Sequence, residues 1–329
     1  MEKVVFTGSR LFMKFPNLEY FEKRLKEIDC ELVEVRDADD EALKTQLKNA
    51  IAVALIARNL NAEIIGAMER CRIILTLSVG YDCVDVAAAT AKLIPVCNTP
   101  AYCTDEVANH AITLLLSLAR KIHLIVPKSR EAVWDYKYTK PIFNFKSKIL
   151  GIVGLGRVGR ALVPKAKGFG MKICAYDPYV EDDIFALLGI ERKYELTELL
   201  KEADYVSIHT PLTPETYHMI DAAALARMKE QAIIINTARG PIIDEEALAD
   251  TLDSGKIAAA GIDVLETEPP GADNPLLSKQ NALVTPHVAW YSEEAFEADM
   301  VDGMDELERV LQGKRPRFIV NPEIFGRRK

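Results

Sequence analysis

The chain has 329 residues, of which 49% are hydrophobic and 27% are charged, and its formal net charge at pH 7 is −8. This length and composition indicate a soluble globular protein with two domains of ordinary size. The acidic balance argues against a nucleic-acid-binding surface, because such surfaces usually carry a basic patch. The sequence also has no apolar run near the roughly 20 residues that a membrane-spanning helix needs.

The N-terminus and the cysteines bear on the compartment in which the protein works. The first residues, MEKVVFTGSR, lead almost directly into a strand-like run and show no signal-peptide pattern. The six cysteines form neither a C-x-x-C motif nor a Cys/His spacing typical of a metal site. We therefore expect reduced cysteines and a cytoplasmic protein that binds no metal, membrane or nucleic acid.

Short β-rich runs alternate with longer segments of helical period along nearly the whole chain. Many of these runs are almost entirely apolar, as strands are when helices cover both faces of a parallel sheet. They include KVVFTG, IAVALIA, ILGIVGLG, AIIINTA and NALVTP. The alternation predicts an α/β protein with parallel sheets in two Rossmann-like or flavodoxin-like lobes.

One long helix and an aromatic segment interrupt this alternation. Residues Thr104 to Ile122 are expected to form a single helix, whose two adjacent apolar stripes suggest burial between two bodies. The following segment, VPKSREAVWDYKYTKPIFNFKSK, is too aromatic for a free linker, and we expect it to pack on something, such as a partner chain. One lobe would then comprise residues 1–97 and about 293–329, and the other residues 98–292.

The strongest local motif is a glycine turn between a predicted strand and a predicted helix. Gly154, Gly156 and Gly159 form G-x-G-x-x-G, which permits a tight turn, approach of a pyrophosphate to the backbone, and close helix–strand packing. The next strand ends in Asp177, near the spacing of about 20 residues expected of a ribose-binding acid. No Arg follows directly in DPYVEDD, so the motif favours NAD over NADP. The alternative is a turn that binds no ligand.

Three polar residues, Arg239, Glu268 and His287, each lie just beyond an apolar strand in the same part of the chain. Ligands of open α/β sheets bind at the carboxyl ends of the strands, where these side chains can meet. Alone, each of the three has an ordinary alternative, as a surface arginine in a turn, a solvated loop carboxylate or a structural histidine. Together they fit hydride transfer to a carbonyl: the histidine supplies a proton, the carboxylate favours imidazolium and holds the ring, and the arginine binds a carboxylate.

Over nearly its whole length the chain resembles the D-isomer-specific 2-hydroxyacid dehydrogenase family. The segments that carry this resemblance are SVGYDCVD, LGIVGLGRVGR, INTARGPIIDEEAL, GIDVLETEPP and TPHVAW. The resemblance implies a first lobe that binds substrate, a second lobe that binds NAD, an active site in the cleft between them, and a homodimer built around the cofactor lobe. It also implies a reversible NAD-dependent oxidoreductase that acts on the CH–OH group of a small 2-hydroxyacid.

The same resemblance gives roles to single residues. It makes His287 the acid–base group, Glu268 its partner and Arg239 the substrate-binding arginine, while Val79 and Gly80 offer backbone amides to the substrate carboxylate. The cofactor residues that it implies are Gly154, Gly156, Arg157, Val158, Gly159, Asp177, Thr210, Pro211, Ala238 and Asp263, the last of which would orient the nicotinamide amide. The remaining histidines are expected not to be catalytic, with His110 packing in the long helix and His218 at the surface.

Trp290 and the segment PVCNTPAYCTDEVANHA are most similar to the branch that includes the C-terminal-binding-protein corepressors and their bacterial relatives. Trp290 would either wall the substrate pocket or pack in a hinge. Two alternatives to a simple dehydrogenase stay open: a phosphoglycerate- or hydroxypyruvate-type enzyme, and an NADH-sensing scaffold with vestigial activity. Specificity is expected to lie in the first lobe, in the RLFMKFP loop and at Arg58.

Overall fold

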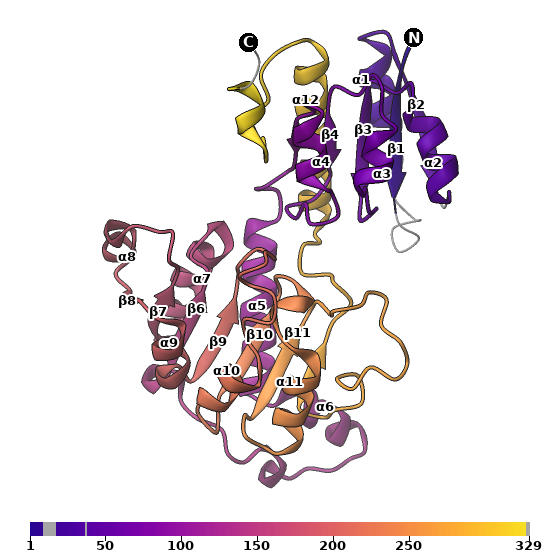
Figure 1. The fold of residues 1–329 in the computed structure, drawn as a ribbon. Coiled ribbons are helices and arrows are strands. Elements are labelled where there is room, and N and C mark those ends of the chain that lie inside the picture. Colours follow the sequence, from indigo (N-terminus) through magenta and orange to yellow (C-terminus); the bar gives the residue numbers. More distant parts are fainter. Residues whose placement is uncertain (9–17, 37, 327–329) are drawn as a thin grey trace. The chain divides into compact units, whose positions relative to one another are not determined.

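The computed structural model describes residues 1–8, 18–36 and 38–326 (Figure 1). The chain divides into two compact units, Met1–Cys103 with Ser292–Lys329, and Thr104–Tyr291. The RLFMKFP loop, in which specificity is expected, lies outside the described residues.

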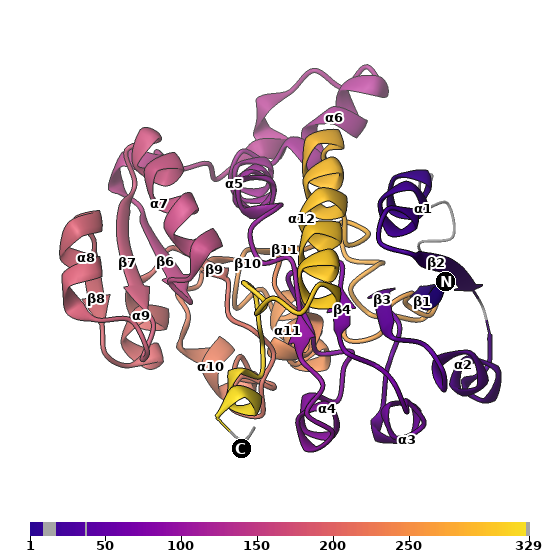
Figure 2. The ribbon, with the colours of Figure 1, turned by 90° about the horizontal axis from the view of Figure 1, so that it is seen from above.

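The first unit is built on a five-stranded parallel sheet in the order β2-β1-β3-β4-β5. Its strands are β1 (Glu2–Gly8), β2 (Cys30–Arg36), β3 (Ala52–Ile56), β4 (Ile74–Thr76) and β5 (Val96–Cys97). Its helices are α1 (Glu19–Lys26), α2 (Asp40–Leu47), α3 (Ala62–Gly66), α4 (Val86–Ala91), α12 (Glu293–Leu311) and the 3₁₀ turn η5 (Pro322–Phe325). Figure 2 shows α1 and α12 on one face of this sheet and α2, α3 and α4 on the other, which explains why β3 is buried along its whole length.

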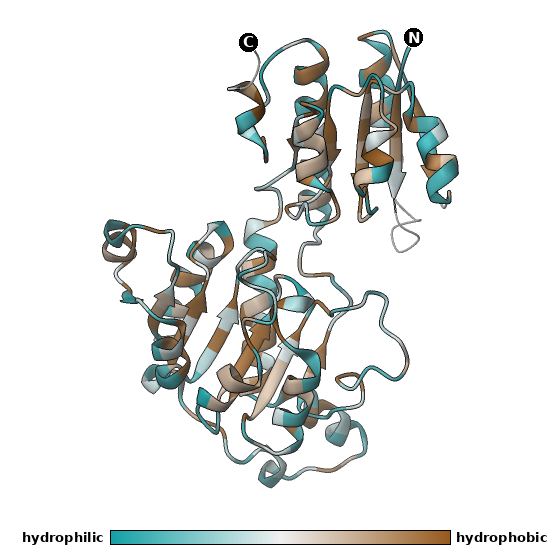
Figure 3. Ribbon diagram, in the orientation of Figure 1, coloured by the Kyte–Doolittle hydropathy of each residue, from teal (hydrophilic) through white to brown (hydrophobic). Residues whose placement is uncertain are grey.

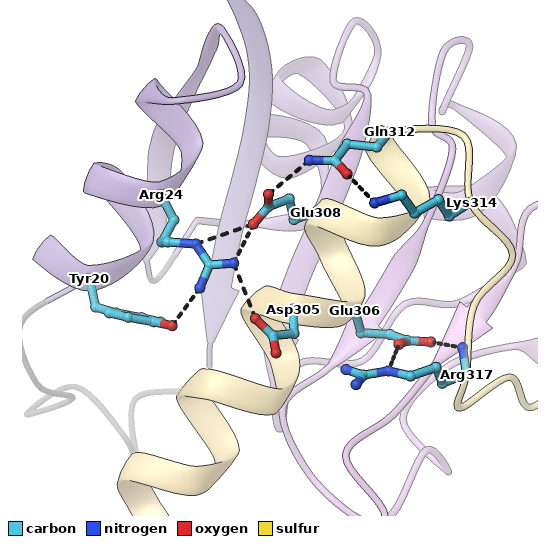
Figure 4. A network of polar contacts seen from close by, with 8 residues as sticks. All are labelled: Tyr20, Arg24, Asp305, Glu306, Glu308, Gln312, Lys314 and Arg317. Atoms are coloured by element: carbon cyan, nitrogen blue, oxygen red, sulfur yellow. Dashed lines mark hydrogen bonds and ion pairs between the residues drawn. The ribbon is translucent and has the colours of Figure 1, made fainter.

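Helix α12 is held in the first unit by charged contacts as well as by its apolar face (Figure 4). Arg24 on α1 forms ion pairs with Glu308 and, at 3.1 Å, with Asp305. The fully buried Glu306 pairs with the Arg317 guanidinium at 3.2 Å and also accepts a hydrogen bond from the Arg317 backbone. A buried carboxylate needs such partners to offset its desolvation. The Arg24 ion pairs thus join α12 to α1, and the Glu306 contacts join α12 to the segment that follows it.

The second unit contains a seven-stranded parallel sheet in the order β12-β11-β10-β9-β6-β7-β8. Its strands are β6 (Ile149–Val153), β7 (Lys172–Tyr176), β8 (Glu191–Lys193), β9 (Tyr205–Ile208), β10 (Ile233–Asn236), β11 (Ala259–Ile262) and β12 (Ala282–Val284). Most of them are hydrophobic in Figure 3. The strand order reverses at β6, which is where doubly wound sheets bind their ligands. Two parallel sheets covered by helices confirm the predicted α/β class.

Helices cover both faces of this second sheet. The helices of the unit are α5 (Thr104–Ala119), α6 (Ile122–Arg130), α7 (Arg157–Gly168), α8 (Asp182–Leu188), α9 (Leu196–Glu202), α10 (Ala222–Arg227) and α11 (Glu245–Asp253), with the 3₁₀ turns η2 (Tyr136–Thr139), η3 (Phe145–Ser147) and η4 (Gly240–Ile242). Helices α5 and α7 pack on one side of the sheet, and α9, α10 and α11 pack on the other. The unit thus has three layers, as parallel sheets require.

The helix predicted to run from Thr104 to Ile122 ends earlier in the structure. Helix α5 stops at Ala119, and Lys121 has a left-handed backbone with φ 55°, which no α-helix can continue through. Helix α6 then starts in a direction bent by 62° from α5. No single helix of the described residues is long and apolar enough to cross a bilayer, although this bent pair passes the test of length and composition together.

Candidate active site

The glycine turn lies at the end of β6, where the strand order reverses. Gly154 has φ +91°, and a Cβ added to it would lie 2.7 Å from the carbonyl oxygen of His209. A Cβ on Gly159 would lie 2.3 Å from the carbonyl oxygen of Gly154. Gly156, the N-cap of α7, has instead nothing within 4 Å of its would-be Cβ. Gly154 and Gly159 are therefore required by the packing of the turn. Gly156 instead leaves open space beside the helix N-terminus, as a bound pyrophosphate needs.

Asp177 follows β7 and is fixed beside the glycine turn. One of its carboxylate oxygens accepts a hydrogen bond from the Leu155 backbone N–H at 2.8 Å, and the other accepts one from Tyr179 N–H at 2.9 Å. Arg192, on the neighbouring strand β8, donates to the Asp177 carbonyl oxygen at 3.4 Å. Its guanidinium also pairs with Asp182 at 2.6 Å. An arginine therefore does lie near Asp177, although the segment DPYVEDD itself contains none.

Two threonines just beyond the ends of β9 and β10 carry buried hydroxyls. The Oγ1 atoms of Thr210 and Thr237 are buried, and neither has a hydrogen-bond partner among the described residues. Buried hydroxyls are almost always paired, so each points to a group that is absent from the protein chain alone. Thr210 was predicted to be a cofactor residue, and Thr237 precedes Ala238, another of the predicted cofactor residues. The residues present therefore fit a dinucleotide across the ends of β6, β9 and β10.

His287 and Glu268 come together beyond two neighbouring strands. His287 follows β12, Glu268 lies in the loop after β11, and the His287 Nδ1 atom is 2.6 Å from Glu268 Oε2. The other Glu268 oxygen accepts a hydrogen bond from the Leu265 backbone N–H at 2.8 Å. Their side chains are 36% and 28% exposed, so both remain open to a small molecule. With Nδ1 held by the carboxylate, Nε2 is the ring nitrogen left to face a reactant.

The electrostatics of Glu268 involve Arg239, which follows β10. Burial raises the pKa of Glu268, but the hydrogen bond from His287, the charges of His287 and Arg239, and the Leu265 N–H together lower it below its ordinary value. Glu268 is therefore an ionised carboxylate at neutral pH, suited to hold an imidazolium. The Arg239 backbone oxygen accepts a hydrogen bond from the Asn236 side chain at 2.8 Å, which fixes the residue at the strand end.

The turn that carries His287 is organised by Asp263. This buried carboxylate accepts hydrogen bonds from the Thr285 hydroxyl at 2.6 Å and from the backbone N–H groups of Val288 and Ala289 at 3.0 and 2.9 Å. His287 itself adopts φ +50° and donates its N–H to the Asp263 carbonyl oxygen at 2.8 Å. A non-glycine residue rarely adopts this conformation unless its surroundings hold it. Asp263 thus positions the histidine, and its role toward the nicotinamide stays a prediction.

His110 on α5 belongs to the same network, although it was expected only to pack. Its Nε2 atom lies 3.0 Å from the Thr285 hydroxyl oxygen and 3.5 Å from Asp263 Oδ1. Because the single hydroxyl proton of Thr285 points to Asp263, His110 Nε2 must be the donor. No cluster of three or more His, Cys, Asp or Glu side chains that could hold a metal is found within residues 1–8, 18–36 and 38–326.

Comparison with known proteins identifies the family. A family model described as "D-isomer specific 2-hydroxyacid dehydrogenase, NAD binding domain" matches residues 112–289, more than half of the chain. The glyoxylate reductase of Korarchaeum cryptofilum is 40% identical over 83% of this chain and 82% of that protein. The chain belongs to the D-isomer specific 2-hydroxyacid dehydrogenases, a family of NAD-dependent oxidoreductases.

Other members of this dehydrogenase family differ in length and in named substrate. The D-3-phosphoglycerate dehydrogenase of Methanocaldococcus jannaschii is 40% identical over 85% of this chain, but the chain spans only 53% of that protein. A solved D-lactate dehydrogenase from Aquifex aeolicus, in complex with NAD and lactic acid, superposes with a TM-score of 0.84. It is 28% identical and covers 94% of this chain and 96% of its own. The family and fold are therefore shared, while the substrates vary.

The predicted substrate residues of this dehydrogenase are divided between the two units. Trp290 belongs to the His287 turn, since its Nε1–H donates to the His287 carbonyl oxygen at 3.0 Å. Val79 and Gly80 follow β4 in the first unit, where the Val79 carbonyl oxygen accepts from the Asn98 side chain at 2.7 Å. The Gly80 carbonyl oxygen accepts from the Ser78 hydroxyl at 2.6 Å. Within the described residues neither amide of this pair donates a hydrogen bond, and their role as substrate ligands stays a prediction.

Three residues around Glu268 were not singled out from the sequence. A Cβ on Gly240, the residue after Arg239, would lie 2.0 Å from the Leu265 carbonyl carbon, so the arginine segment packs directly on the Glu268 loop. His218 was expected to lie at the surface, and Glu266 has no motif of its own. In the structure their side chains lie 3.0 Å apart, and both are less than one third exposed. In the sequence, the only sign of this packing is the glycine at position 240, directly after Arg239.

Proposed function

We propose that the chain is an NAD-dependent D-2-hydroxyacid dehydrogenase that reversibly transfers hydride between NADH and a small 2-oxoacid. The observation that carries the proposal is the 2.6 Å contact between His287 Nδ1 and Glu268 Oε2 in the unit that contains the NAD-binding domain. Arg239 lies near enough for its charge to lower the pKa of Glu268. An acid–base pair beside a cation and a dinucleotide site is what carbonyl reduction requires.

The proposed cofactor site begins at the glycine turn, where the open space beside Gly156 suits a pyrophosphate. Gly154, Gly156 and Gly159, with Arg157 and Val158 at the start of α7, would hold the pyrophosphate. Asp177 would accept hydrogen bonds from the adenosine ribose. Further along the sheet, Thr210 and Pro211 would border the adenosine, and Ala238 and Asp263 the nicotinamide. When bound, NADH supplies the hydride.

The remaining chemistry is done by side chains of the chain. Arg239 would bind the carboxylate of the 2-oxoacid with paired N–H donors and polarise its carbonyl oxygen. As hydride reaches the carbonyl carbon, the oxygen becomes an alkoxide and takes the proton from Nε2 of the His287 imidazolium. Glu268 holds Nδ1–H throughout and stabilises the charged ring. The reverse reaction returns the proton to Nε2. The overall balance is 2-oxoacid + NADH + H⁺ to D-2-hydroxyacid + NAD⁺.

The substrate would be small, and Trp290, whose indole is tied to the His287 turn, would offer an apolar wall. The test is loss of NADH absorbance with a panel that includes glyoxylate, hydroxypyruvate, pyruvate, branched and aromatic 2-oxoacids and 3-phosphohydroxypyruvate. Turnover of one of them supports the proposal. Binding of NADH with no turnover of any of them would contradict it and favour the alternative of an NADH-sensing scaffold.

Assembly and compartment form part of the same proposal. Helix α6 buries none of its residues, and Ile122, Val126, Trp134 and Tyr136 are large apolar side chains exposed by 46%, 41%, 91% and 69%. Exposed apolar surface of this kind marks protein interfaces, so we include a homodimer through α6 and the following segment. The six cysteines are all free thiols, which suits a cytoplasmic protein. Size-exclusion chromatography with light scattering decides between a monomer and a dimer.

A further inference from the structure

The orientation of Glu268 depends on the loop that carries it. Leu265 N–H donates to one Glu268 oxygen while His287 binds the other, so residues Leu265–Glu268 form a small closed unit around the carboxylate. Glu266 lies in the middle of this loop, and its side chain contacts groups outside the loop. Whatever holds Glu266 therefore also holds the backbone from which Glu268 approaches His287.

Glu266 is bound at two places that are distant in the sequence. Its Oε1 atom lies 3.0 Å from His218 Nε2 and also accepts the Glu245 backbone N–H, at the start of α11, at 3.1 Å. Glu245 returns the contact, because its carboxylate accepts the Glu266 backbone N–H, and it also binds the Asn274 side chain at 2.8 Å. This reciprocal pairing of two residues resembles a capping box, in which each side chain satisfies the backbone of the other.

The same cluster also reaches the arginine segment. The backbone N–H of His218 donates to the Pro241 carbonyl oxygen at 2.8 Å, and Gly240 packs against Leu265 with no room for a Cβ. His218 has φ +48°, and its ring stacks on Tyr217 at 4.1 Å between centroids. The Glu266–His218 contact therefore joins the Glu268 loop to the segment that begins at Arg239.

The charges in this cluster explain why a histidine lies there. Glu245 and Glu266 approach each other through their reciprocal contacts, and the Asp244 carboxylate lies 3.9 Å from His218 Nδ1. His218 Nε2–H provides a hydrogen-bond donor among these carboxylates. Ion pairs of partly exposed groups add little stability, so the use of this contact lies in the geometry that it imposes on the loop.

We propose that Glu266 and His218 form a positioning pair for the reaction, which keeps the Glu268 carboxylate on His287 Nδ1 and the Arg239 segment beside it. The inference rests on the proposed dehydrogenase function for its kinetic consequence. The effect of the pair on the contact between Glu268 and His287 can be tested without any turnover of substrate. Neither residue would touch the reacting atoms, so both act only through Glu268 and Arg239.

The test compares Glu266→Ala with Glu266→Gln in the full chain. The alanine variant loses both acceptor contacts, and we expect kcat to fall by about 10- to 100-fold, since small misplacements of reacting groups have effects of this size. Gln keeps Oε1 as acceptor for His218 and Glu245, so kcat should stay within about threefold of the wild type. NADH affinity, measured by fluorescence titration, should not change in either variant. His218→Ala should act like Glu266→Ala, and the double variant should be no worse than either one.

A second readout needs no substrate. The Nδ1–H proton shared between His287 and Glu268 should give a downfield resonance in the proton NMR spectrum, identified by its loss in His287→Ala. We expect Glu266→Ala to broaden or abolish this resonance and Glu266→Gln to retain it. The matched control is Asp253→Asn, which breaks an exposed ion pair with Lys279 in the same unit and should leave both readouts unchanged.

The outcomes separate the two proposals. A wild-type chain that turns over no 2-oxoacid, yet loses the resonance in Glu266→Ala, would contradict the dehydrogenase function and leave the positioning pair supported. An active wild type whose kcat and resonance both survive Glu266→Ala would overturn the positioning pair alone. A Glu266→Gln variant as impaired as Glu266→Ala would also overturn it, because the proposed role requires only an acceptor oxygen.

Discussion

Glu268 Oε2 lies 2.6 Å from His287 Nδ1, although the two residues follow different strands of the sheet. The carboxylate is held on its other side by a backbone N–H, and the histidine is held by the carbonyl oxygen of Asp263. The carboxylate cannot turn away without breaking this second contact, and the backbone bond to Asp263 fixes the position from which the imidazole extends. Contacts within the protein therefore hold the pair in place, as efficient proton transfer requires.

Replacing Glu268 with Gln should show what the charge contributes. The amide can still accept a hydrogen bond from Nδ1–H but does not stabilise imidazolium, so we expect kcat to fall by about 10²-fold with NADH affinity unchanged. Steady-state kinetics and an NADH titration measure the two effects. A kcat that stays within twofold of the wild type would show that the carboxylate charge is not used.

The lowered pKa of Glu268 also makes a prediction about stability and pH. An acid whose pKa is lower in the folded chain contributes stability that is present above its unfolded value and is lost as the pH falls through its folded value. Wild type should therefore exceed Glu268→Gln in melting temperature by more at pH 7 than at pH 3. Thermal unfolding followed by circular dichroism at several pH values measures the difference. A constant difference would contradict the assigned pKa direction.

Asp299 should make the stability of the chain depend on pH in the direction opposite to Glu268. It lies on α12, and burial raises its pKa to about 7 against the hydrogen bond from the Thr99 hydroxyl, which is 2.5 Å away and lowers it. The folded chain then binds a proton that the unfolded chain has released, so this group costs stability as the pH rises from about 4 to 7. Asp299→Asn should match the wild type near pH 4 and exceed it at pH 8, by at most about 4 kcal/mol. Urea unfolding at both pH values tests this, and an equal effect at both would contradict it.

His209, which lies behind the glycine turn, should give a third dependence of folded stability on pH. Burial of its ring lowers the pKa of His209 to about 4, and its Nε2 lies 2.8 Å from the Ser207 hydroxyl. The unfolded chain binds a proton below its ordinary pKa of 6.5, so folded stability should fall as the pH drops from 6.5 toward 4. His209→Gln should lack this fall relative to the wild type. The free energy of unfolding in urea is measured against pH for both proteins. If it changes with pH equally in the two, the His209 ring stays accessible to protons in the folded chain.

The strands could be predicted from the sequence because their pattern is local. A run such as AIIINTA is apolar throughout, and the structure buries β10 on both faces within a parallel sheet. The glycine turn was visible for the same reason, since its strand, glycines and helix are consecutive. The end of α5 was missed because nothing in its residue types marks Lys121 as left-handed. Tertiary packing decides that conformation.

The contacts around the candidate site could be predicted only in part. Arg239, Glu268 and His287 stand out because each follows a strand, and strand ends converge in a parallel sheet. His218 and Glu266 are 48 residues apart and lie in no shared motif, so only the folded chain shows their contact. Asp263 was noticed for its motif, but its bonds to the His287 turn depend on the register of β11 and β12.

Gly240 gives a direct test of the packing between the arginine segment and the Glu268 loop. In Gly240→Ala the new methyl would lie 2.0 Å from the Leu265 carbonyl carbon and 2.4 Å from the Glu266 nitrogen, both backbone atoms that cannot turn aside. Since the loop must move, we expect kcat to fall by about 10²-fold. The free energy of unfolding should fall by an amount on the order of 1–3 kcal/mol.

The control for Gly240→Ala is Gly168→Ala at the end of α7, where nothing lies within 4 Å of the added Cβ. That variant should keep full activity and gain up to about 1 kcal/mol, because alanine suits a helix better than glycine. Kinetics and thermal unfolding of both variants provide the comparison. Full activity in Gly240→Ala would mean that the Glu268 loop tolerates displacement, and that the contact between Glu268 and His287 does not depend on how closely Gly240 approaches Leu265.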